Sequence, residues 1–293
     1  LAVADRIRAA IIGTGNIGMD LMFKIKNRSR YMELVLVTGL RDSQGITLAK
    51  QAGYAVSTQG IEALRGRGDI RIVFDATLAS AHMRHAPIFR EEGMVAVDLT
   101  PAAVGPYIVP TVNLMENIEA DNVNLITCGG QATIPIVYAI SRVLPVEYAE
   151  IVSTISSASA GPGTRGSIDE FTITTARGLR EVGGAKRSKA LILLNPADPP
   201  MMMNNTIYCM VDPNKYDQKA VEAAVSAMVA KVREYVPGYR LKIPPEFDGK
   251  RILTMVEIQG AGDYLPTYSG NLDIETSAAL AVGEKIAAHM LGV

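Results

Sequence analysis

The sequence predicts an α/β protein with an N-terminal Rossmann-type doubly wound parallel sheet and a C-terminal α+β domain with a mixed or antiparallel sheet. The first half contains short continuous apolar runs separated by helix-length segments, as in parallel strands that are buried on both faces. A Gly-x-Gly-x-x-Gly string follows the first of these runs. After about Leu144, apolar and polar residues alternate instead, which indicates strands with one exposed face.

The first half resolves into a series of buried strands. Residues 9–12 form the first strand, and residues 19–25, after the glycines, have helical spacing. Further strands are expected at 34–37, 71–75, 95–98 and 124–127. We therefore expect a dinucleotide-binding domain over residues 1–130.

The second half combines alternating strands with amphipathic helices. The alternating strands are expected at 151–156, 206–211 and 253–258. One helix begins with a capping box at 167–170 and ends at Gly183-Gly184, and another covers about 218–235. We expect a catalytic and dimerisation domain over 131–271, with an alanine-rich final helix, 272–293, packing back on the first domain.

Composition excludes several classes of protein. The chain has 293 residues, 48% of them hydrophobic, and a net charge of -1, so no feature favours binding to nucleic acid or to an anionic membrane. The two cysteines form no Cys-x-x-Cys pair, and the three histidines accompany no carboxylate cluster, so we expect neither a disulfide framework nor a metal site. The apolar start, residues 1–4, is too short for a signal peptide, and no apolar run is long enough to span a bilayer. A cytoplasmic protein is expected.

The glycine string predicts a dinucleotide site, because it follows a strand and precedes a helix. Its glycines allow a tight turn and a close approach of the pyrophosphate to the helix N-terminus. The residue that meets the adenosine ribose remains open. Asp42 could bind the ribose hydroxyls of NAD, whereas Arg41 could favour the 2′-phosphate of NADP; NAD is the expected cofactor.

Cys128 is the candidate nucleophile. It lies where an apolar strand ends and a helix begins, so backbone N–H groups and the helix dipole are expected to lower its pKa. Most lone cysteines in apolar strands are small hydrophobic residues, and we read Cys209 that way. The small-residue loop at 157–166 also precedes a helix start, where backbone can approach a ligand closely.

Several motifs together resemble the acylating acetaldehyde dehydrogenase family over nearly the whole chain. They are Gly13-Thr14-Gly15-Asn16-Ile17-Gly18, Asp98-Leu99-Thr100-Pro101-Ala102-Ala103, Cys128-Gly129-Gly130-Gln131-Ala132-Thr133-Ile134-Pro135, Ser159-Ala160-Gly161-Pro162-Gly163-Thr164-Arg165, Ile168-Asp169-Glu170-Phe171, Tyr264-Leu265-Pro266 and Gly270-Asn271-Leu272-Asp273. The resemblance implies a fold similar to glyceraldehyde-3-phosphate dehydrogenase.

The resemblance also implies a reaction. A short aldehyde such as acetaldehyde or propanal, NAD and coenzyme A would give acyl-CoA and NADH, through a thiohemiacetal and an acyl-thioester on Cys128. Backbone N–H groups around 129–131 are candidates to hold the oxyanion. No histidine lies in a catalytic motif, so water or coenzyme A itself would handle the proton.

The resemblance assigns further site residues and partners. Cofactor contacts are implied for Gly13, Thr14, Gly15, Asn16, Ile17, Ser159, Ala160, Gly161, Pro162, Gly163, Thr164, Arg165, Gly166, Ser167 and Asn271, and an aldehyde pocket for Ile168 and Ile192. The partner would be a 4-hydroxy-2-oxoacid (4-hydroxy-2-oxovalerate) aldolase of aromatic-compound catabolism, which passes its aldehyde through a tunnel, and the assembly a homodimer within a heterotetramer.

Three departures from the family pattern bear on the site. Asn204-Asn205 stands where the family often has Arg-Asp, and that acid would position groups or handle protons, so Asn205 is a candidate catalytic residue. Arg41 replaces the acid of the family's Gly-Ile-Asp, and Ser167 replaces a common Asn. Two other readings stay open: a semialdehyde or acyl-phosphate reductase, which needs phosphate instead of coenzyme A, and an inactive nicotinamide-binding protein.

Overall fold

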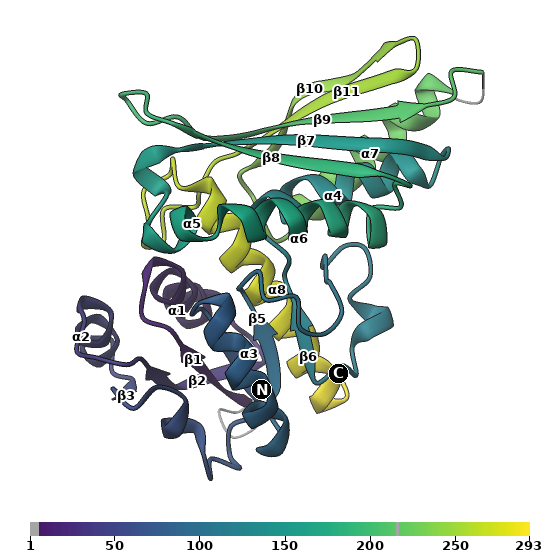
Figure 1. The fold of residues 1–293 in the computed structure, drawn as a ribbon. Coiled ribbons are helices and arrows are strands. Elements are labelled where there is room, and N and C mark those ends of the chain that lie inside the picture. Colours follow the sequence, from purple (N-terminus) through teal and green to yellow (C-terminus); the bar gives the residue numbers. More distant parts are fainter. Residues whose placement is uncertain (1–5, 215–216) are drawn as a thin grey trace. The chain divides into compact units, whose positions relative to one another are not determined.

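Two units with separate sheets make up the part of the chain that the computed structural model describes, residues 6–214 and 217–293 (Figure 1). Unit 1 contains the chain up to Pro110, together with Leu114–Leu125 and Glu275–Val293. Unit 2 contains Thr111–Asn113 and Ile126–Ile274, so Cys128 belongs to it. The expectation for residues 1–4 falls outside the described residues.

Unit 1 is built on a parallel sheet in the order β3-β2-β1-β4-β5-β6. The strands are β1 (Ile7–Ile12), β2 (Met32–Thr38), β3 (Ala55–Ser57), β4 (Ile72–Asp75), β5 (Val95–Asp98) and β6 (Asn122–Asn124). The helices are α1 (Asn16–Arg28), α2 (Gln44–Gln51) and α3 (Ala79–Glu91), with short 3₁₀ turns η2 (Gly60–Leu64) and η3 (Met115–Asn117). This order is that of a doubly wound sheet, and it places the switch in strand order beside β1 and β4.

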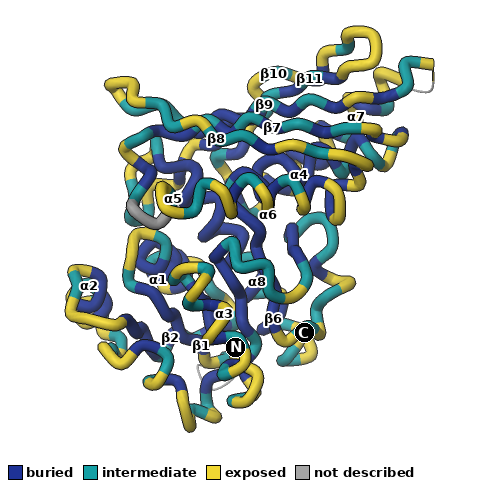
Figure 2. The backbone as a smooth tube through the Cα atoms, viewed as in Figure 1, coloured by how far each residue is buried: buried dark blue, intermediate teal, exposed yellow. Residues whose placement is uncertain are grey.

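Continuous burial of the central strands confirms the reason for predicting a parallel sheet. All four residues of β4 are buried, as are the last four of β1. Figure 2 shows the inner part of this unit, around β1 and β2, largely in the dark blue of buried residues. One buried ion pair also lies in this unit: Asp20 Oδ2 accepts hydrogen bonds from Lys24 Nζ at 2.7 Å and from Thr276 Oγ1 at 2.5 Å. Because Thr276 belongs to α8 (Gly270–Leu291), these bonds connect α1 to the last helix.

The strand expected at 124–127 was wrong in its position. The observed strand β6 ends at Asn124, and the next three residues have no regular structure. Leu125 still donates its N–H to the carbonyl of Asp98 at 2.9 Å, but Ile126 takes a left-handed conformation with φ of 70°. A β-branched residue with positive φ is strained, and it ends the extended chain here.

Unit 2 contains a mixed sheet in the order β10-β11-β9-β7-β8. Its described strands are β7 (Val146–Ser156), β8 (Ser188–Asn195), β9 (Met203–Val211), β10 (Tyr239–Asp248) and β11 (Arg251–Ile258). Of these, β7 and β8 pair in parallel, and the other neighbours pair antiparallel. Helices α4 (Cys128–Ser141), α6 (Ile168–Glu181) and α7 (Gln218–Arg233) lie on one face of this sheet (Figure 1). The predicted α/β class with a mixed second sheet is confirmed.

The start of α6 differs from its prediction. Ser167 precedes the helix, but its side chain makes no capping hydrogen bond, so the expected capping box is wrong. The short helix α5 (Pro162–Gly166) runs almost directly into α6, and Ser167 instead contributes its carbonyl, which accepts from Phe171 N–H at 2.9 Å. The glycine end is confirmed: Gly184 has φ of 82° and donates to the carbonyl of Arg180.

Candidate active site

The glycine loop after β1 has the geometry of a pyrophosphate cradle. Gly13 has φ of 111°, and a Cβ there would collide with the backbone of Ala76. A Cβ on Gly18 would collide with the Gly13 carbonyl, so this glycine lets α1 pack closely on the loop. Gly15 is different, because nothing lies within 4 Å of a Cβ built on it. It caps α1 without a side-chain hydrogen bond, which leaves the helix N-terminus open to an anion.

A pocket of about 620 Å³ adjoins this loop within unit 1. Its walls combine the glycine loop with the segments that follow β2 and β4 and with one face of α3. Among the residues that line it are Thr14, Arg41, Ser43, Thr77, Arg84 and His85. Thr14 Oγ1 and Ser43 Oγ lie 2.9 Å apart, and Ser43 also caps α2 by accepting from Ile46 N–H. These bonds fix the mouth of the loop against the end of β2.

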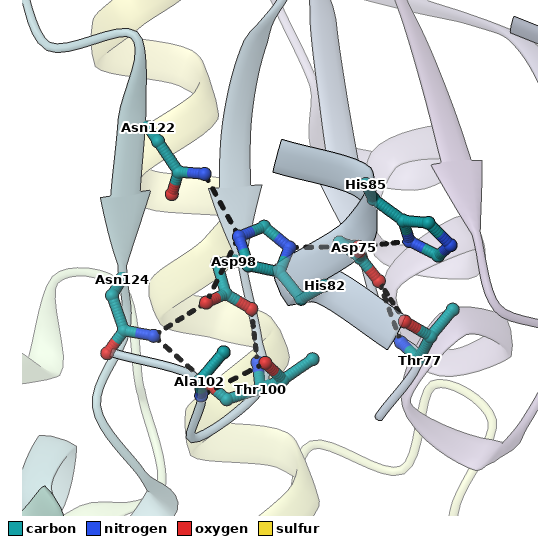
Figure 3. Close-up of polar contacts among 9 residues, drawn as sticks. All are labelled: Asp75, Thr77, His82, His85, Asp98, Thr100, Ala102, Asn122 and Asn124. Carbon is teal, nitrogen blue, oxygen red and sulfur yellow. Dashed lines mark hydrogen bonds and ion pairs between the residues drawn. The ribbon is translucent and has the colours of Figure 1, made fainter. Parts of the chain in front are cut away.

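Buried acids at the ends of β4 and β5 organise a polar network behind this pocket (Figure 3). Asp75 Oδ2 accepts from Nδ1 of His82 at 2.9 Å and from Nδ1 of His85 at 2.8 Å. Asp75 Oδ1 accepts from Thr77 N–H at 3.0 Å. Since Thr77 and His85 both line the pocket, Asp75 holds two of its walls in place.

The second half of the network surrounds Asp98. Nε2 of His82 lies 2.9 Å from Asn122 Nδ2 and 3.4 Å from Asp98 Oδ2. Asp98 Oδ2 accepts from Asn124 Nδ2 at 2.7 Å, and its other oxygen accepts from Thr100 N–H at 2.8 Å. Each carboxylate therefore has several donors, as buried charges require.

The two acids differ in pKa. Burial raises the pKa of Asp75, but hydrogen bonds from His82 and His85 outweigh it and bring the pKa down to about 2. Burial dominates at Asp98 and raises its pKa to about 6, although the charge of His82 opposes this. Burial and the neighbouring Asp98 also raise the pKa of Glu275 well above its usual range. Asp75 therefore carries the charge that attracts the two imidazoles.

Cys128 opens helix α4 in unit 2, as the strand-to-helix junction predicts. The N-cap is Thr127, whose Oγ1 accepts from Gly130 N–H at 2.9 Å and lies 2.6 Å from Thr175 Oγ1. Cys128 is partly exposed, whereas Cys209 is fully buried in β9, where burial raises its pKa to about 12. The second helical residue, Gly129, has no intrahelical acceptor for its N–H.

Gly129 brings the N-terminus of α4 against the sheet. A Cβ at this position would lie 2.5 Å from Phe171 Cζ and 2.7 Å from Ser153 Oγ. Ser153 in turn occupies a row of paired residues that crosses three strands, with Ile192 of β8 on one side and Asn205 of β9 on the other. The structure thus brings two predicted site residues, Ile192 and Asn205, to the strand positions that flank the contact with Gly129.

Asn205 is fully buried, and neither its Oδ1 nor its Nδ2 finds a hydrogen-bond partner among the described residues. The same holds for the hydroxyl of Ser153 beside it. Unpartnered buried polar groups are costly and often mark functional sites. Asn204 has an ordinary environment by contrast, because its Oδ1 accepts from Lys242 Nζ at 2.8 Å.

The predicted cofactor loop is held by its own backbone. Arg165 donates to the carbonyl of Ala160 at 3.0 Å and to that of Ser157 at 3.1 Å, and Ser159 Oγ donates to the carbonyl of Ser156 at 2.8 Å. Pro162 and Gly163 begin α5, but their burial and contacts lie outside what the structure describes. Ala160 is buried, and Gly161, Thr164, Gly166 and Ser167 line the turn into α6.

Two further predicted residues lie at helix starts in unit 2. Ile168 is the first residue of α6 and is half-buried. Asn271 is the second residue of α8, buried, and its Oδ1 has no hydrogen-bond partner in the described part of the chain.

Sequence reasoning missed Ser153, Asp75 and the two histidines. His82 and His85 lie in no catalytic motif of the sequence; the structure buries both, and each contacts Asp75. Strands that end in an acid were a usable signal for Asp75. For Ser153 the signal was a polar residue in the same alternation phase as Ile151 and Ile155, which are buried. In the described residues no group of His, Cys, Asp and Glu could hold a metal ion, and none of the described helices could cross a membrane.

Known proteins match both units. The model for prokaryotic acetaldehyde dehydrogenase, dimerisation, matches residues 128–266, and the model for the NAD binding domain of semialdehyde dehydrogenase matches residues 8–120. An acetaldehyde dehydrogenase of Desulfitobacterium hafniense is 62% identical over 290 residues, which cover 98% of this chain and 97% of that protein. The chain belongs to the acetaldehyde dehydrogenase family. The predictions of an enzyme, an acetaldehyde dehydrogenase, and of an NAD-binding domain are confirmed.

A further relative and a solved structure are also similar to this chain. An acetaldehyde dehydrogenase of Thermus thermophilus is 55% identical over 299 residues, with 99% of this chain and 97% of that protein covered. Aspartate semialdehyde dehydrogenase II from Vibrio cholerae superposes with a TM-score of 0.65 over 96% of this chain and 98% of that chain, at 13% identity. At that identity the superposition supports the fold alone.

Proposed function

We propose that this acetaldehyde dehydrogenase is acylating: it oxidises a short aldehyde with a nicotinamide dinucleotide and transfers the acyl group from Cys128 to coenzyme A. The observation that carries the proposal is the position of Cys128. It is partly exposed at the start of α4, and Gly129 and Gly130 follow it in the helix. A nucleophile at a helix N-terminus is stabilised as its thiolate.

The residues of each unit fit a nicotinamide dinucleotide. In unit 1, the open space at Gly15 and the uncapped N-terminus of α1 suit a pyrophosphate. In unit 2, the buried Oδ1 of Asn271 has no partner among the described residues, and a carboxamide N–H would satisfy it. When bound, the oxidised cofactor accepts the hydride released from the aldehyde carbon.

Cys128 carries the covalent steps. Its thiolate attacks the aldehyde carbonyl and forms a thiohemiacetal, whose oxyanion is stabilised by backbone N–H groups at the start of α4. Gly130 N–H already donates to Thr127 Oγ1, and Gln131 N–H to the Thr127 carbonyl, so Gly129 N–H is the best candidate donor. Loss of hydride leaves an acyl-thioester on Cys128. The thiolate of coenzyme A then attacks that carbonyl, releases acyl-CoA and regenerates Cys128.

We assign Asn205 an indirect role, without contact to the aldehyde. It is buried beside Ser153, which lies against Gly129, so we assign it to positioning the turn that carries Cys128. Ile168 and Ile192 supply apolar surface for the alkyl group of the aldehyde. The loop 159–167 contacts the cofactor through backbone, since its Arg165 is engaged by its own carbonyls.

The assembly is proposed from the family model and from the sheet. The matched model describes a dimerisation region, and in the described part of unit 2 the helices lie on one face of the sheet (Figure 1). Half-buried residues alternate along the other face in β7, and Leu193 and Met210 are exposed in the neighbouring strands. A homodimer through this face, joined to a 4-hydroxy-2-oxoacid aldolase that feeds aldehyde through a tunnel, is the expected complex. Co-expression with the aldolase and light scattering would test it; separate elution of the two proteins would contradict it.

Mass spectrometry of the enzyme tests the covalent step. Acetaldehyde and oxidised cofactor without coenzyme A should add one acetyl group to Cys128, and coenzyme A should remove it. Cys128→Ala should show no adduct and no turnover while retaining cofactor affinity, and Cys209→Ala is the matched control that should still be acylated. Normal turnover in Cys128→Ala would refute the mechanism.

A further inference from the structure

The pocket beside the glycine loop, where a dinucleotide is proposed to bind, has two arginines and no acid among its described lining residues. Specificity for NAD normally uses a carboxylate near the end of the second strand, which accepts hydrogen bonds from the adenosine ribose hydroxyls. Among the described residues that line this pocket, none is Asp or Glu, whereas Arg41 and Arg84 both contribute to its wall. The pocket therefore lacks the group that recognises an unmodified ribose.

Asp42 does not supply the missing acid. It is exposed, and it lines a separate hollow with Thr47, Lys50 and Ser57, beyond the start of α2. Arg41, one residue earlier, lines the dinucleotide pocket itself. Of the two alternatives that the sequence left open at this point, the geometry favours Arg41.

The guanidinium groups of Arg41 and Arg84 have N–H donors that are available to a ligand. Arg41 is exposed and makes no hydrogen bond or ion pair with the rest of the chain that the structure describes. Arg84 donates from one nitrogen to the carbonyl of Ser80 at 2.8 Å, which fixes its stem along α3 and leaves its other donors available. A planar guanidinium suits a phosphate, since it can donate two parallel hydrogen bonds.

We propose that Arg41 and Arg84 form a subsite for a phosphate on the adenosine ribose. This rests on the proposed binding of a nicotinamide dinucleotide and of coenzyme A by this enzyme. A 2′-phosphate is carried by NADP and a 3′-phosphate by coenzyme A. Because the end of the second strand meets the 2′ position in this fold, the 2′-phosphate is the expected ligand, and NADP should bind more tightly than NAD.

Calorimetry with three adenosine nucleotides tests the subsite on the intact enzyme. Adenosine 2′,5′-bisphosphate, adenosine 3′,5′-bisphosphate and 5′-AMP share the same base and 5′-phosphate, and the first two have equal charge. The 2′,5′ isomer should bind about tenfold to a hundredfold more tightly than 5′-AMP, as expected for charge-assisted hydrogen bonds. Tighter binding of the 3′,5′ isomer would keep the subsite and assign it to coenzyme A. Equal binding of all three would overturn the proposal.

Variants distinguish a direct contact between Arg41 and the phosphate from a general effect of nearby positive charge. Arg41→Ala should abolish most of the preference for the bisphosphate while leaving 5′-AMP affinity within about threefold. Lys50→Ala, which removes a nearby cation outside the pocket, and Asp42→Asn should leave the preference unchanged. If Asp42→Asn instead weakens NAD binding and Arg41→Ala has no effect, Asp42 is the ribose ligand and the proposal is wrong.

The nucleotide test and the acylation test fail independently. Binding of the bisphosphate without any acylation of Cys128 would refute the proposed function and keep a phosphate subsite. Acylation of Cys128 with equal affinity for all three nucleotides would keep the proposed function and remove the subsite. Arg41→Asp gives a kinetic readout as well, since it should move the ratio of kcat/KM for NADP over NAD towards NAD.

Discussion

Gly129→Ala should destabilise unit 2 and disturb the turn that carries Cys128. The new Cβ would lie 2.5 Å from Phe171 Cζ and 2.7 Å from Ser153 Oγ, both closer than carbon atoms in proteins normally approach. Phe171 is buried and Ser153 is fully buried, so neither side chain can move into solvent. The helix must therefore shift away from the sheet, or the ring must leave its preferred conformation.

The cost follows from overpacking. Extra atoms in a well-packed core raise the free energy by about 1–3 kcal/mol, and two simultaneous contacts place this site in the upper half of that range. Gly161→Ala is the matched control in the same unit, because nothing lies within 4 Å of its Cβ and its φ is -72°. That variant should be neutral or more stable by less than about 1 kcal/mol.

Denaturant unfolding of the two variants and the native enzyme measures these costs. Phe171→Leu removes the ring carbon that meets the new Cβ, so Gly129→Ala combined with Phe171→Leu should lose less stability than the sum of the single variants. The rate at which iodoacetamide labels Cys128 should change in Gly129→Ala and stay unchanged in Gly161→Ala. Wild-type stability and labelling in Gly129→Ala would refute the argument that this glycine seats α4 on the sheet.

Three further predictions concern other parts of the molecule. Asn205→Asp buries a carboxyl group whose pKa burial should raise, so its titration should shift the pH profile of kcat away from that of the native enzyme; an unchanged pH profile would remove Asn205 from the site. The pKa of Asp75 is lowered from 3.8 to about 2, so the ionised carboxylate stabilises the folded state by about 2 kcal/mol above pH 3.8. This contribution disappears as the pH falls towards 2. Asp75→Asn should therefore make the free energy of urea unfolding less dependent on pH in that range. Lys24→Ala should cost about 3–5 kcal/mol in thermal or urea unfolding because it leaves Asp20 buried without its cation, whereas the exposed Lys26→Ala should change stability by less than about 0.5 kcal/mol.

The strands and helices that sequence could predict are those with strong local signals. Continuous apolar runs located β1, β2, β4 and β5, and the glycines located the loop before α1. The sequence placed the end of β6 too late because Ile126 turns the chain with a positive φ, a conformation that an apolar β-branched residue does not predict. The capping box at Ser167 failed because α5 arrives directly before it.

The parts of the candidate site that lie in one local motif could be predicted from the sequence. The parts that depend on contacts between distant residues could not. Cys128 and the glycine loop are local motifs, so their positions followed from the chain order. The environment of Asn205 depends on strand register, which pairs it with Ser153 and places that pair against Gly129. The contrast between Arg41 and Asp42 depends on which way the turn after β2 faces, and only the three-dimensional pocket distinguishes them.

The central claim is that an acyl group passes from Cys128 to coenzyme A. The most direct measurement is formation of the reduced nicotinamide from acetaldehyde and from propanal, with coenzyme A, with inorganic phosphate, or with neither, on enzyme co-expressed with the aldolase proposed as its partner. The account predicts sustained turnover only with coenzyme A, with acyl-CoA formed in equal amount to the reduced cofactor. Turnover that requires phosphate instead, or no turnover with any acceptor while the cofactor still binds, would contradict it.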